Sequence, residues 1–384
     1  MTQEQQSLLN ILSNSLFNHH YPVLESPLGE AQAQAVSGIV CAAMKDAPEQ
    51  LLFMDASNSA RIFYNHAVLH KWLSSSNIPY VILKGCASAY YYPDPTLRSM
   101  GDVDFLVPGD YLEAAGQILD AQGLKPWDEK HIAHIVYRGA GMHYEMHFKV
   151  AGFPNGHVGE LMEQYFSDVF ERAVLGTVGD SQMMLPSPFH HGLVLLLHTV
   201  HHMTGEGIGL RHLCDWAVFE NSLSNDEFVE MYEDKLQAVG LWRFAQILTQ
   251  VSIKYLGAEK REWAGEANEL ADQLMEDILS SGNFGVKDAG RSYQTMMISD
   301  RGKDGVGKTG MFSQFAESVN NVLYLKLPAA KKHKALLIPG WLFYGGRYGV
   351  RVLVSKRKNM LDKDIVEGAE KRRNLYKRLE LYEA

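Results

Sequence analysis

The stretch IPYVILKGCASAYYYPDPTLRSMGDVDFLV, residues 78–107, decides the fold of this chain. Its first part, 78–83, is a short apolar run rich in β-forming residues, which predicts a strand. A Lys-Gly pair and the small side chains within 86–92 then predict a turn into a helix. Residues 102–107 alternate polar and apolar side chains, as a half-buried strand does. We therefore expect a strand, a turn, a helix and a second strand in this order.

The sequence on both sides of this stretch is helical in character. Apolar side chains recur every three or four residues, which predicts amphipathic helices. These helices are expected over residues 5–18, 58–73, 111–121, 192–200, 210–221, 226–255 and 263–280. Two more strands are expected over 131–137 and 143–150. The chain from residue 161 onward is otherwise expected to be helical, except for a long mobile loop over the glycine-rich segment 283–310.

These elements predict an α+β protein, with a small mixed β-sheet core between extensive helical N- and C-terminal parts. Four segments are expected along the chain. They are N-terminal helices over 1–77, the core sheet over 78–155, a helical domain over 156–325 and a basic helical tail over 326–384.

The composition is that of a folded protein in a reducing compartment. Of the 384 residues, 46% are hydrophobic and 21% charged, so the chain can bury a large core. Three scattered cysteines are too few for a disulfide framework or a four-cysteine zinc site, which favours the cytoplasm. The N-terminus lacks the basic and apolar regions of a signal peptide, and no uninterrupted apolar run is long enough for a membrane span. We therefore expect a protein that is neither exported nor inserted in a membrane.

The net charge of −9 conceals an uneven distribution. Residues 326–384 hold 15 lysines and arginines against 6 acidic residues, a net charge of +9, which leaves −18 for the first 325 residues. The acidic average argues against a protein wrapped on nucleic acid, and the basic tail weakens that argument without establishing such a partner. Within the tail, 331–358 could lie on an anionic membrane surface, bind RNA or pack as helices on the acidic body. We favour packing.

Two carboxylates in the second expected strand could do chemistry. Asp102 and Asp104 stand two residues apart, so both side chains project from one face of the sheet. Adjacent carboxylates repel each other, and a shared magnesium ion allows both to stay ionised beside a triphosphate. Glu145, in a later strand with His147 on the same face, would complete an acidic triad for two metal ions. The alternative for these carboxylates is a solvated strand face.

Basic residues flank the expected carboxylate site. Lys84 and Gly85 follow the first strand, which places a cation and backbone amides beside the carboxylates, as suits a nucleoside triphosphate. Arg98 lies in the next loop, where it either reaches phosphate oxygens or pairs with Asp94 or a helix end. The sequence leaves both roles of Arg98 open.

Two helical patterns are interpreted as structural. Arg211 and Asp215, four residues apart on one helix, are expected to form an intrahelical ion pair, with a cleft-lining role as the alternative. His198, His201 and His202 have a spacing that could present imidazoles to zinc, but the glutamate of the H-E-x-x-H motif is absent. We therefore expect ordinary, satisfied helix histidines.

Residues 302–309, GKDGVGKT, match the P-loop pattern letter for letter. A working P-loop needs a buried strand before it and a helix after it, inside a repeated α/β pattern. Upstream only 296–298 is apolar, and the region lacks the alternation. We therefore expect a mobile basic loop that could fold over a bound substrate, with NTP hydrolysis dependent on Lys308 as the alternative.

Several of these motifs together resemble a known family. They are VILKG at 81–85, YPDP at 92–95, LR at 97–98, GDVDFLV at 101–107, EMHF at 145–148, His198 and GIGLRHLCDW at 207–216. In this order they resemble the bacterial family of uncharacterised nucleotidyltransferases, which is part of the polymerase-β-like nucleotidyltransferase superfamily. The resemblance covers roughly residues 60–220.

The resemblance implies a small mixed sheet flanked by helices, with magnesium bound by Asp102, Asp104 and Glu145. The superfamily usually has glycine and serine after the first strand, whereas this chain has Lys84 and Gly85 followed by cysteine. Triphosphate binding is therefore expected to rest on Lys84, the backbone amide of Gly85 and Arg98, without a serine hydroxyl.

The implied activity is magnesium-dependent transfer of a nucleoside monophosphate from an NTP, such as ATP, to an unknown acceptor. The alternative is a catalytically silent member that uses the fold as a binding or scaffold module, in polysaccharide assembly or with a toxin–antitoxin partner.

Overall fold

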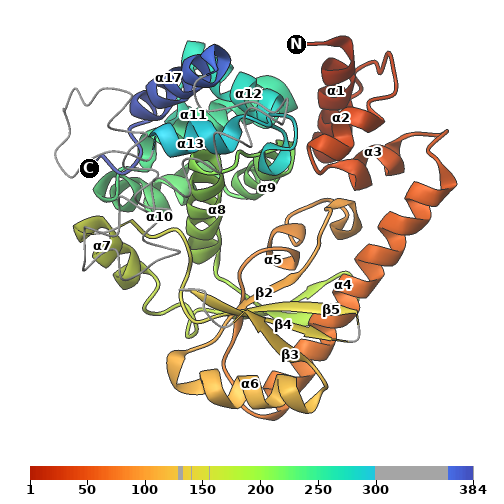
Figure 1. The fold of residues 1–384 in the computed structure, drawn as a ribbon, viewed down its shortest axis with the longest axis vertical. Helices are drawn as coiled ribbons and strands as arrows, with labels where there is room; N and C mark the ends of the chain where they lie inside the picture. Colours follow the sequence, from red (N-terminus) through yellow and green to blue (C-terminus); the bar gives the residue numbers. More distant parts are fainter. Residues whose placement is uncertain (129–132, 140, 155, 299–361, 384) are drawn as a thin grey trace, which may run out of the picture.

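The computed structural model describes residues 1–128, 133–139, 141–154, 156–298 and 362–383. The predicted α+β class is confirmed, because a mixed sheet lies against a larger helical part (Figure 1). The P-loop-like segment 302–309 and the basic segment 331–358 lie outside the described residues.

Five strands form the central sheet in the order β1-β2-β5-β4-β3. They are β1 (Val81–Ile82), β2 (Val103–Leu106), β3 (Lys125–Asp128), β4 (His134–Gly139) and β5 (Met142–His147). Only β2 and β5 run parallel; the other neighbours are antiparallel. The expected strands 78–83, 102–107 and 143–150 are therefore present, each shorter than predicted.

One face of the sheet is apolar and packs on two helices, α4 (Glu49–Ser75) and α6 (Leu112–Ala121) (Figure 1). Phe105 and Tyr144, both 0% exposed, share a core with residues of these helices. Because side chains alternate along a strand, their neighbours on β2 and β5, Asp104 and Glu145, point to the opposite face. That second face holds the polar residues of β2 and β5 and lies toward the helical part.

A β-hairpin corrects the expectation that the chain beyond residue 161 is wholly helical. Its strands are β6 (Val174–Val178) and β7 (Ser181–Leu185). Along β7 the first, third and fifth side chains are buried, a period of two that marks a strand. The hairpin packs with β7 against α4 and β1, so it belongs to the core of the sheet.

The second, larger core is helical. Its helices and those around the sheet include α1 (Gln3–Phe17), α2 (Leu28–Ala33), α3 (Ser37–Ala43), α5 (Cys86–Ala89), α7 (His157–Tyr165), α8 (Pro188–Thr204), α9 (Leu210–Asn221), α10 (Asn225–Ala238), α11 (Trp242–Val251), α12 (Glu269–Ser281), α13 (Arg291–Ile298) and α17 (Lys363–Arg378). The N-terminal helices α1 to α3 pack into this core although they precede the sheet in the sequence (Figure 1).

Two predicted boundaries in the helical part are wrong. The single helix expected over 226–255 is divided at Gly240, whose left-handed φ of 64° ends α10 and lets the C-terminal backbone pass close by. The loop expected over 283–310 contains α13, because residues 291–298 pack against α17. The remainder of that segment, 299–310, lies outside the described residues.

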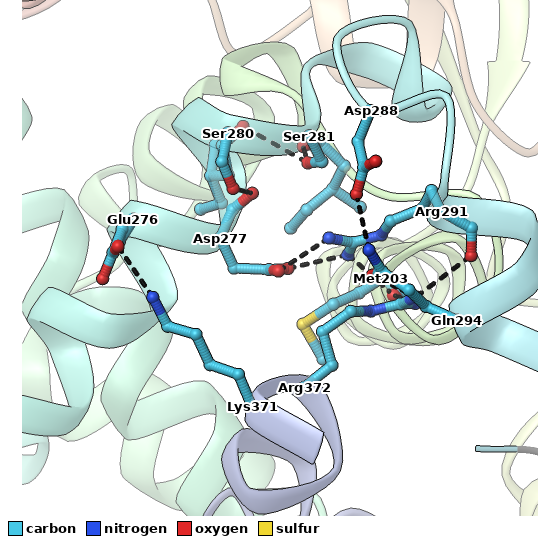
Figure 2. A network of polar contacts seen from close by, with 12 residues as sticks. Met203, Glu276, Asp277, Ser280, Ser281, Asp288, Arg291, Gln294, Lys371 and Arg372 are labelled. Carbon is cyan, nitrogen blue, oxygen red and sulfur yellow. Dashed lines mark hydrogen bonds and ion pairs between the residues drawn. The ribbon is translucent and has the colours of Figure 1, made fainter. Parts of the chain in front are cut away.

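The described end of the basic tail packs on the acidic body (Figure 2), whereas the packing favoured for 331–358 falls outside the described residues. Lys371 of α17 forms an ion pair with Glu276 of α12 at 2.7 Å. Arg372 is 3% exposed and donates to the carbonyl of Met203 and the side chain of Gln294, at 3.4 and 3.3 Å. The helix α17 thus holds the C-terminal end of α8 in the helical core.

Among the described residues, none of the helices combines the length and apolar character needed to cross a bilayer.

A buried histidine of α8 predicts loss of stability in acid. His191 is 0% exposed and stacks on Tyr91 with ring centroids 5.0 Å apart. Burial lowers the pKa of His191 from 6.5 to about 3. The unfolded chain therefore takes up a proton below pH 6.5 that the folded chain excludes, so the contribution of this imidazole is lost as pH falls from 6.5 toward 3.

We expect His191→Phe, which keeps a ring against Tyr91, to make the unfolding temperature less sensitive to acidification. Thermal unfolding followed by circular dichroism at about pH 7 and about pH 5 measures this sensitivity. The control is His157→Phe, at a side chain 79% exposed on α7, which should leave the slope unchanged. A His191→Phe protein that loses stability as steeply as the wild type would contradict the argument.

Candidate functional site

The polar face of the sheet brings together residues from three strands. Asp104 of β2 pairs in register with Glu145 of β5 across the parallel ladder, so the two side chains lie on the same face. Asp102 directly precedes β2, and Lys84 follows β1 by one residue. The backbone amide of Leu83 donates to the carbonyl of Asp104 at 3.0 Å, which holds the end of β1 beside β2.

Asp104 is the centre of this group. It is 4% exposed, and its Oδ1 lies 2.7 Å from Lys84 Nζ and 3.0 Å from His147 Nε2. Burial alone would raise the pKa of Asp104, but Lys84 and the hydrogen bond from His147 outweigh it and hold that pKa well below its usual range. Asp104 is therefore an ionised carboxylate.

Asp102 has the opposite electrostatic environment. Burial, followed by the charges of Asp104 and Glu145, raises the pKa of Asp102 from 3.8 to about 6. Burial lowers the pKa of Lys84, but the charges of Asp104, Glu145 and Asp102 outweigh burial and raise that pKa above its ordinary value. The three acidic side chains thus lie close enough to repel one another, and one lysine compensates them only in part.

Glu145 is surrounded by imidazoles. Its carboxylate oxygens lie 3.7 Å from His147 Nε2, 3.9 Å from His134 Nε2 and 4.0 Å from His143 Nε2. The Glu145 side chain is 19% exposed, so this side of the cluster is open to solvent. The sequence anticipated His147 on this face. His134 was missed because only the pairing of β4 with β5 brings it near Glu145. His143 was missed although it lies two residues before Glu145 on the same strand, where the alternation of side chains already indicates a shared face.

Gly85 adopts φ 58° and ψ −111° at the start of α5, a backbone conformation that favours glycine. A Cβ built on Gly85 would lie 3.7 Å from the carbonyl oxygen of Asp102. This is an ordinary contact distance, so the positive φ of the turn after Lys84, and not lack of space beside the carboxylate strand, favours glycine here.

Arg98 lies in a buried ion pair. Its Nε and one terminal nitrogen each lie 2.7 Å from an oxygen of Asp215, and the two residues are 6% and 5% exposed. The hydroxyl of Tyr92 also donates to Asp215, at 2.8 Å. Asp94, the partner considered from the sequence, instead caps a short helical turn by accepting from the amide of Thr96.

The predicted intrahelical pair between Arg211 and Asp215 is therefore wrong, because Arg98 takes the carboxylate. Arg211 instead lies with its guanidinium 5.6 Å from the centre of the Phe284 ring. With the rest of the described chain it forms no ion pair. Burial and the neighbouring charge of Arg98 lower the pKa of Arg211, while Asp102 is among the groups that raise it. The alternative, a cleft-lining arginine, stays a prediction.

Three histidines of α8 and α9 pack together near Lys84 and are called the histidine wall below: His198, His202 and His212. The rings of His198 and His202 lie 4.5 Å apart, and His198 stacks on His212 at 5.2 Å. Burial lowers the pKa of His202 to about 3, and the charge of Lys84 contributes to the lowering in both His198 and His202. These histidines are therefore neutral rings packed on one another beside the polar face of the sheet.

Family comparison agrees with this arrangement. Residues 31–257 match a family described as uncharacterised nucleotidyltransferases. The chain belongs to this family. The matched span includes the carboxylates, the lysine and the histidine wall, and it confirms the resemblance inferred from the motifs.

Solved nucleotidyltransferase structures are only distantly similar. The antibiotic-resistance factor ANT(2'')-Ia in solution has 12% identity and a TM-score of 0.34, over 46% of this chain and 91% of that one. In complex with adenylyl-2''-tobramycin it has 11% identity and a TM-score of 0.33, over 46% and 98%. An antigenic nucleotidyltransferase-like protein from Paracoccidioides brasiliensis has 17% identity and a TM-score of 0.35, over 53% and 95%. These similarities are too low to carry an argument about substrate, and no curated protein is significantly similar to this chain.

Proposed function

We propose that this protein is a magnesium-dependent nucleotidyltransferase that moves a nucleoside monophosphate from an NTP, such as ATP, to an acceptor. The observation that carries the proposal is the in-register pair Asp104 and Glu145 on adjacent parallel strands, with Asp102 beside them and Lys84 at 2.7 Å. We place the activity in the cytoplasm, since the three cysteines are free and buried, as suits a reducing compartment.

The carboxylates suit a hard divalent cation. Burial, and after it the charges of Asp104 and Glu145, raise the pKa of Asp102, so a cation bound here would stabilise its ionised form. Asp102, Asp104 and Glu145 supply the oxygen ligands that magnesium prefers. Bound magnesium would neutralise the triphosphate and the developing charge on the pyrophosphate. This is the two-metal arrangement that we propose for the site.

The side chains around the carboxylates have distinct proposed tasks. In the reaction an acceptor oxygen bonds to the α-phosphorus, the bond to the bridging oxygen breaks and pyrophosphate leaves. Glu145, partly exposed, is placed to take the proton of the acceptor hydroxyl. Lys84 is positioned to neutralise triphosphate oxygens. Arg98 was expected to help neutralise the triphosphate, but its guanidinium is held in the ion pair with Asp215. We therefore assign this contact to Arg211.

Two labelled nucleotides test the proposal. Full-length protein is incubated with magnesium, cell extract and each NTP, labelled in one series at the α-phosphate and in the other at the γ-phosphate. We expect the α-label to enter an acceptor and the γ-label to leave in pyrophosphate. Release of inorganic γ-phosphate without α-transfer would instead indicate hydrolysis, as a working P-loop predicts. Absence of both would favour the catalytically silent scaffold.

Arg211→Ala is expected to raise the KM for NTP by roughly 10- to 100-fold, the usual range for losing a charged hydrogen bond. The reason is that Arg211 forms no ion pair with the described residues, so its charge is available to a phosphate. Steady-state pyrophosphate release at varied NTP measures the change. Arg172→Ala, which removes an exposed arginine 3.8 Å from Asp168, is the control and should leave KM unchanged. An unaltered KM in Arg211→Ala would exclude the assigned contact.

A further inference from the structure

Histidines gather on the catalytic face of the sheet in a way that a magnesium site does not require. In the antiparallel pair of β4 and β5, His134 lies directly opposite His147, and Val136 lies opposite Glu145. Because directly opposed residues share a face, the two imidazoles and the glutamate project together. Asp104 joins them through its pairing with Glu145 on the other side of β5.

The donor atoms of this group nearly form a metal centre. His147 Nε2 lies 3.0 Å from Asp104 Oδ1 and 3.7 Å from Glu145 Oε2, while His134 Nε2 lies 3.9 Å from that oxygen. The donor atoms of the two histidines and the glutamate all lie within 4.8 Å of one another. Ligands at about 2.1 Å from a tetrahedral metal lie roughly 3.4 Å apart, so small side-chain movements would close the set.

The surroundings also favour a bound cation. His147 is 2% exposed, and its Nδ1 is buried without a hydrogen-bond partner in the described part of the chain. Glu145 and His134 have side chains 19% and 16% exposed, which leaves a route from solvent. The carboxylates of Asp104 and Glu145 would compensate a divalent charge.

The donor types decide which metal fits. Magnesium prefers oxygen ligands, whereas neutral imidazole together with carboxylate suits first-row transition metals such as zinc. We propose that His134, Glu145 and His147, with Asp104 as a fourth ligand, bind one divalent transition-metal ion. Its place in the reaction rests on the proposed function: it would take the acceptor-side position of the two-metal site in place of a second magnesium ion, while Asp102 and Asp104 hold the magnesium that accompanies the NTP. Binding of the metal itself does not depend on that activity.

Cobalt titration tests the site without nucleotide. Full-length protein stripped with a chelator is titrated with Co²⁺, whose visible absorption reports nitrogen and oxygen ligands. We expect one equivalent to bind, zinc to displace it, and a large excess of magnesium to leave the spectrum unchanged. Failure of the wild type to bind Co²⁺, or displacement by magnesium, would overturn the inference.

Variants identify the ligands. His134→Gln and His147→Gln should each weaken Co²⁺ binding by at least about tenfold and alter the spectrum. His157→Gln is the matched control, because it removes an exposed histidine that also lies 3.8 Å from a glutamate, Glu160. Thermal unfolding of the metal-free proteins establishes that they are folded. His134 has a side chain 16% exposed and is less buried than His147, so its variant should fold even if His147→Gln does not. Equal affinity in His134→Gln and wild type would refute the ligand set.

One more variant separates this inference from the proposed function. Asp102→Asn should keep Co²⁺ binding but lose pyrophosphate release, since Asp102 lies outside the histidine set. If the wild type binds Co²⁺ and transfers no nucleotide, the metal site stands and the proposed function fails. If the wild type transfers nucleotide with magnesium and binds no Co²⁺, the proposed function stands and the metal site fails.

Discussion

Asp104→Asn is expected to lower the rate of magnesium-dependent pyrophosphate release by roughly a thousandfold or more. Asparagine keeps the shape of the side chain but removes the charge that lies 2.7 Å from Lys84 and 3.0 Å from His147. On the proposed mechanism the magnesium would lose a carboxylate ligand, and Lys84 would lose the partner that holds it at the proposed triphosphate position. Both effects act on the charge that develops as pyrophosphate leaves.

A coupled assay for pyrophosphate, with the NTP and acceptor found by labelling, measures this loss. Asp110→Asn is the control, because it removes an exposed carboxylate just after the same strand. Circular dichroism shows that each variant is folded. A folded Asp104→Asn protein that turns over within a few-fold of wild type would rule out the carboxylate site as the place of reaction.

Asp215→Ala is expected to destabilise the folded protein by about 3–5 kcal/mol, the cost of leaving one partner of a buried ion pair without its charge. Arg98 is 6% exposed, and both of its bonds to Asp215 are 2.7 Å long, so water cannot replace the carboxylate without opening the core. Tyr92 would lose its acceptor as well. Urea unfolding measures the difference in the free energy of unfolding.

A double variant distinguishes the charge effect from a general loss of packing. Arg98→Met combined with Asp215→Leu removes both charges of the pair and should be more stable than Asp215→Ala alone. Asp120→Ala, which breaks an exposed pair with Lys125, should cost less than about 1 kcal/mol. If Asp215→Ala unfolds at the same urea concentration as Asp120→Ala, the pair does not stabilise the fold as we argue.

The residues that the sequence predicts well are those whose role depends on local pattern. The alternation around Asp102 and Asp104 predicts a strand and a shared face, and the structure places them beside Glu145 and Lys84. Whether they bind metal stays a prediction. The pattern could not show that Glu145 pairs in register with Asp104, because strand order is set by the whole sheet.

Long-range pairs explain most of what the sequence could not show. Arg98 and Asp215 are 117 positions apart, so a local rule assigned Asp215 to Arg211, its neighbour four residues away. The β6–β7 hairpin escaped prediction for a different reason. Its strands have five residues each and several exposed apolar side chains, such as Leu175, which gives a weak alternation.

The parallel pairing of β2 and β5 has a consequence for the order in which the protein folds. Parallel neighbours cannot be joined by a tight turn, so β5 reaches β2 only after the chain has passed through α6, β3 and β4. Contacts between distant segments form slowly during folding. A chain that has folded only as far as β2 holds Asp102, Asp104 and Lys84 but no Glu145. An incompletely folded molecule therefore lacks the full set of carboxylates, and nascent chains are expected to leave cellular NTP intact until the sheet is complete.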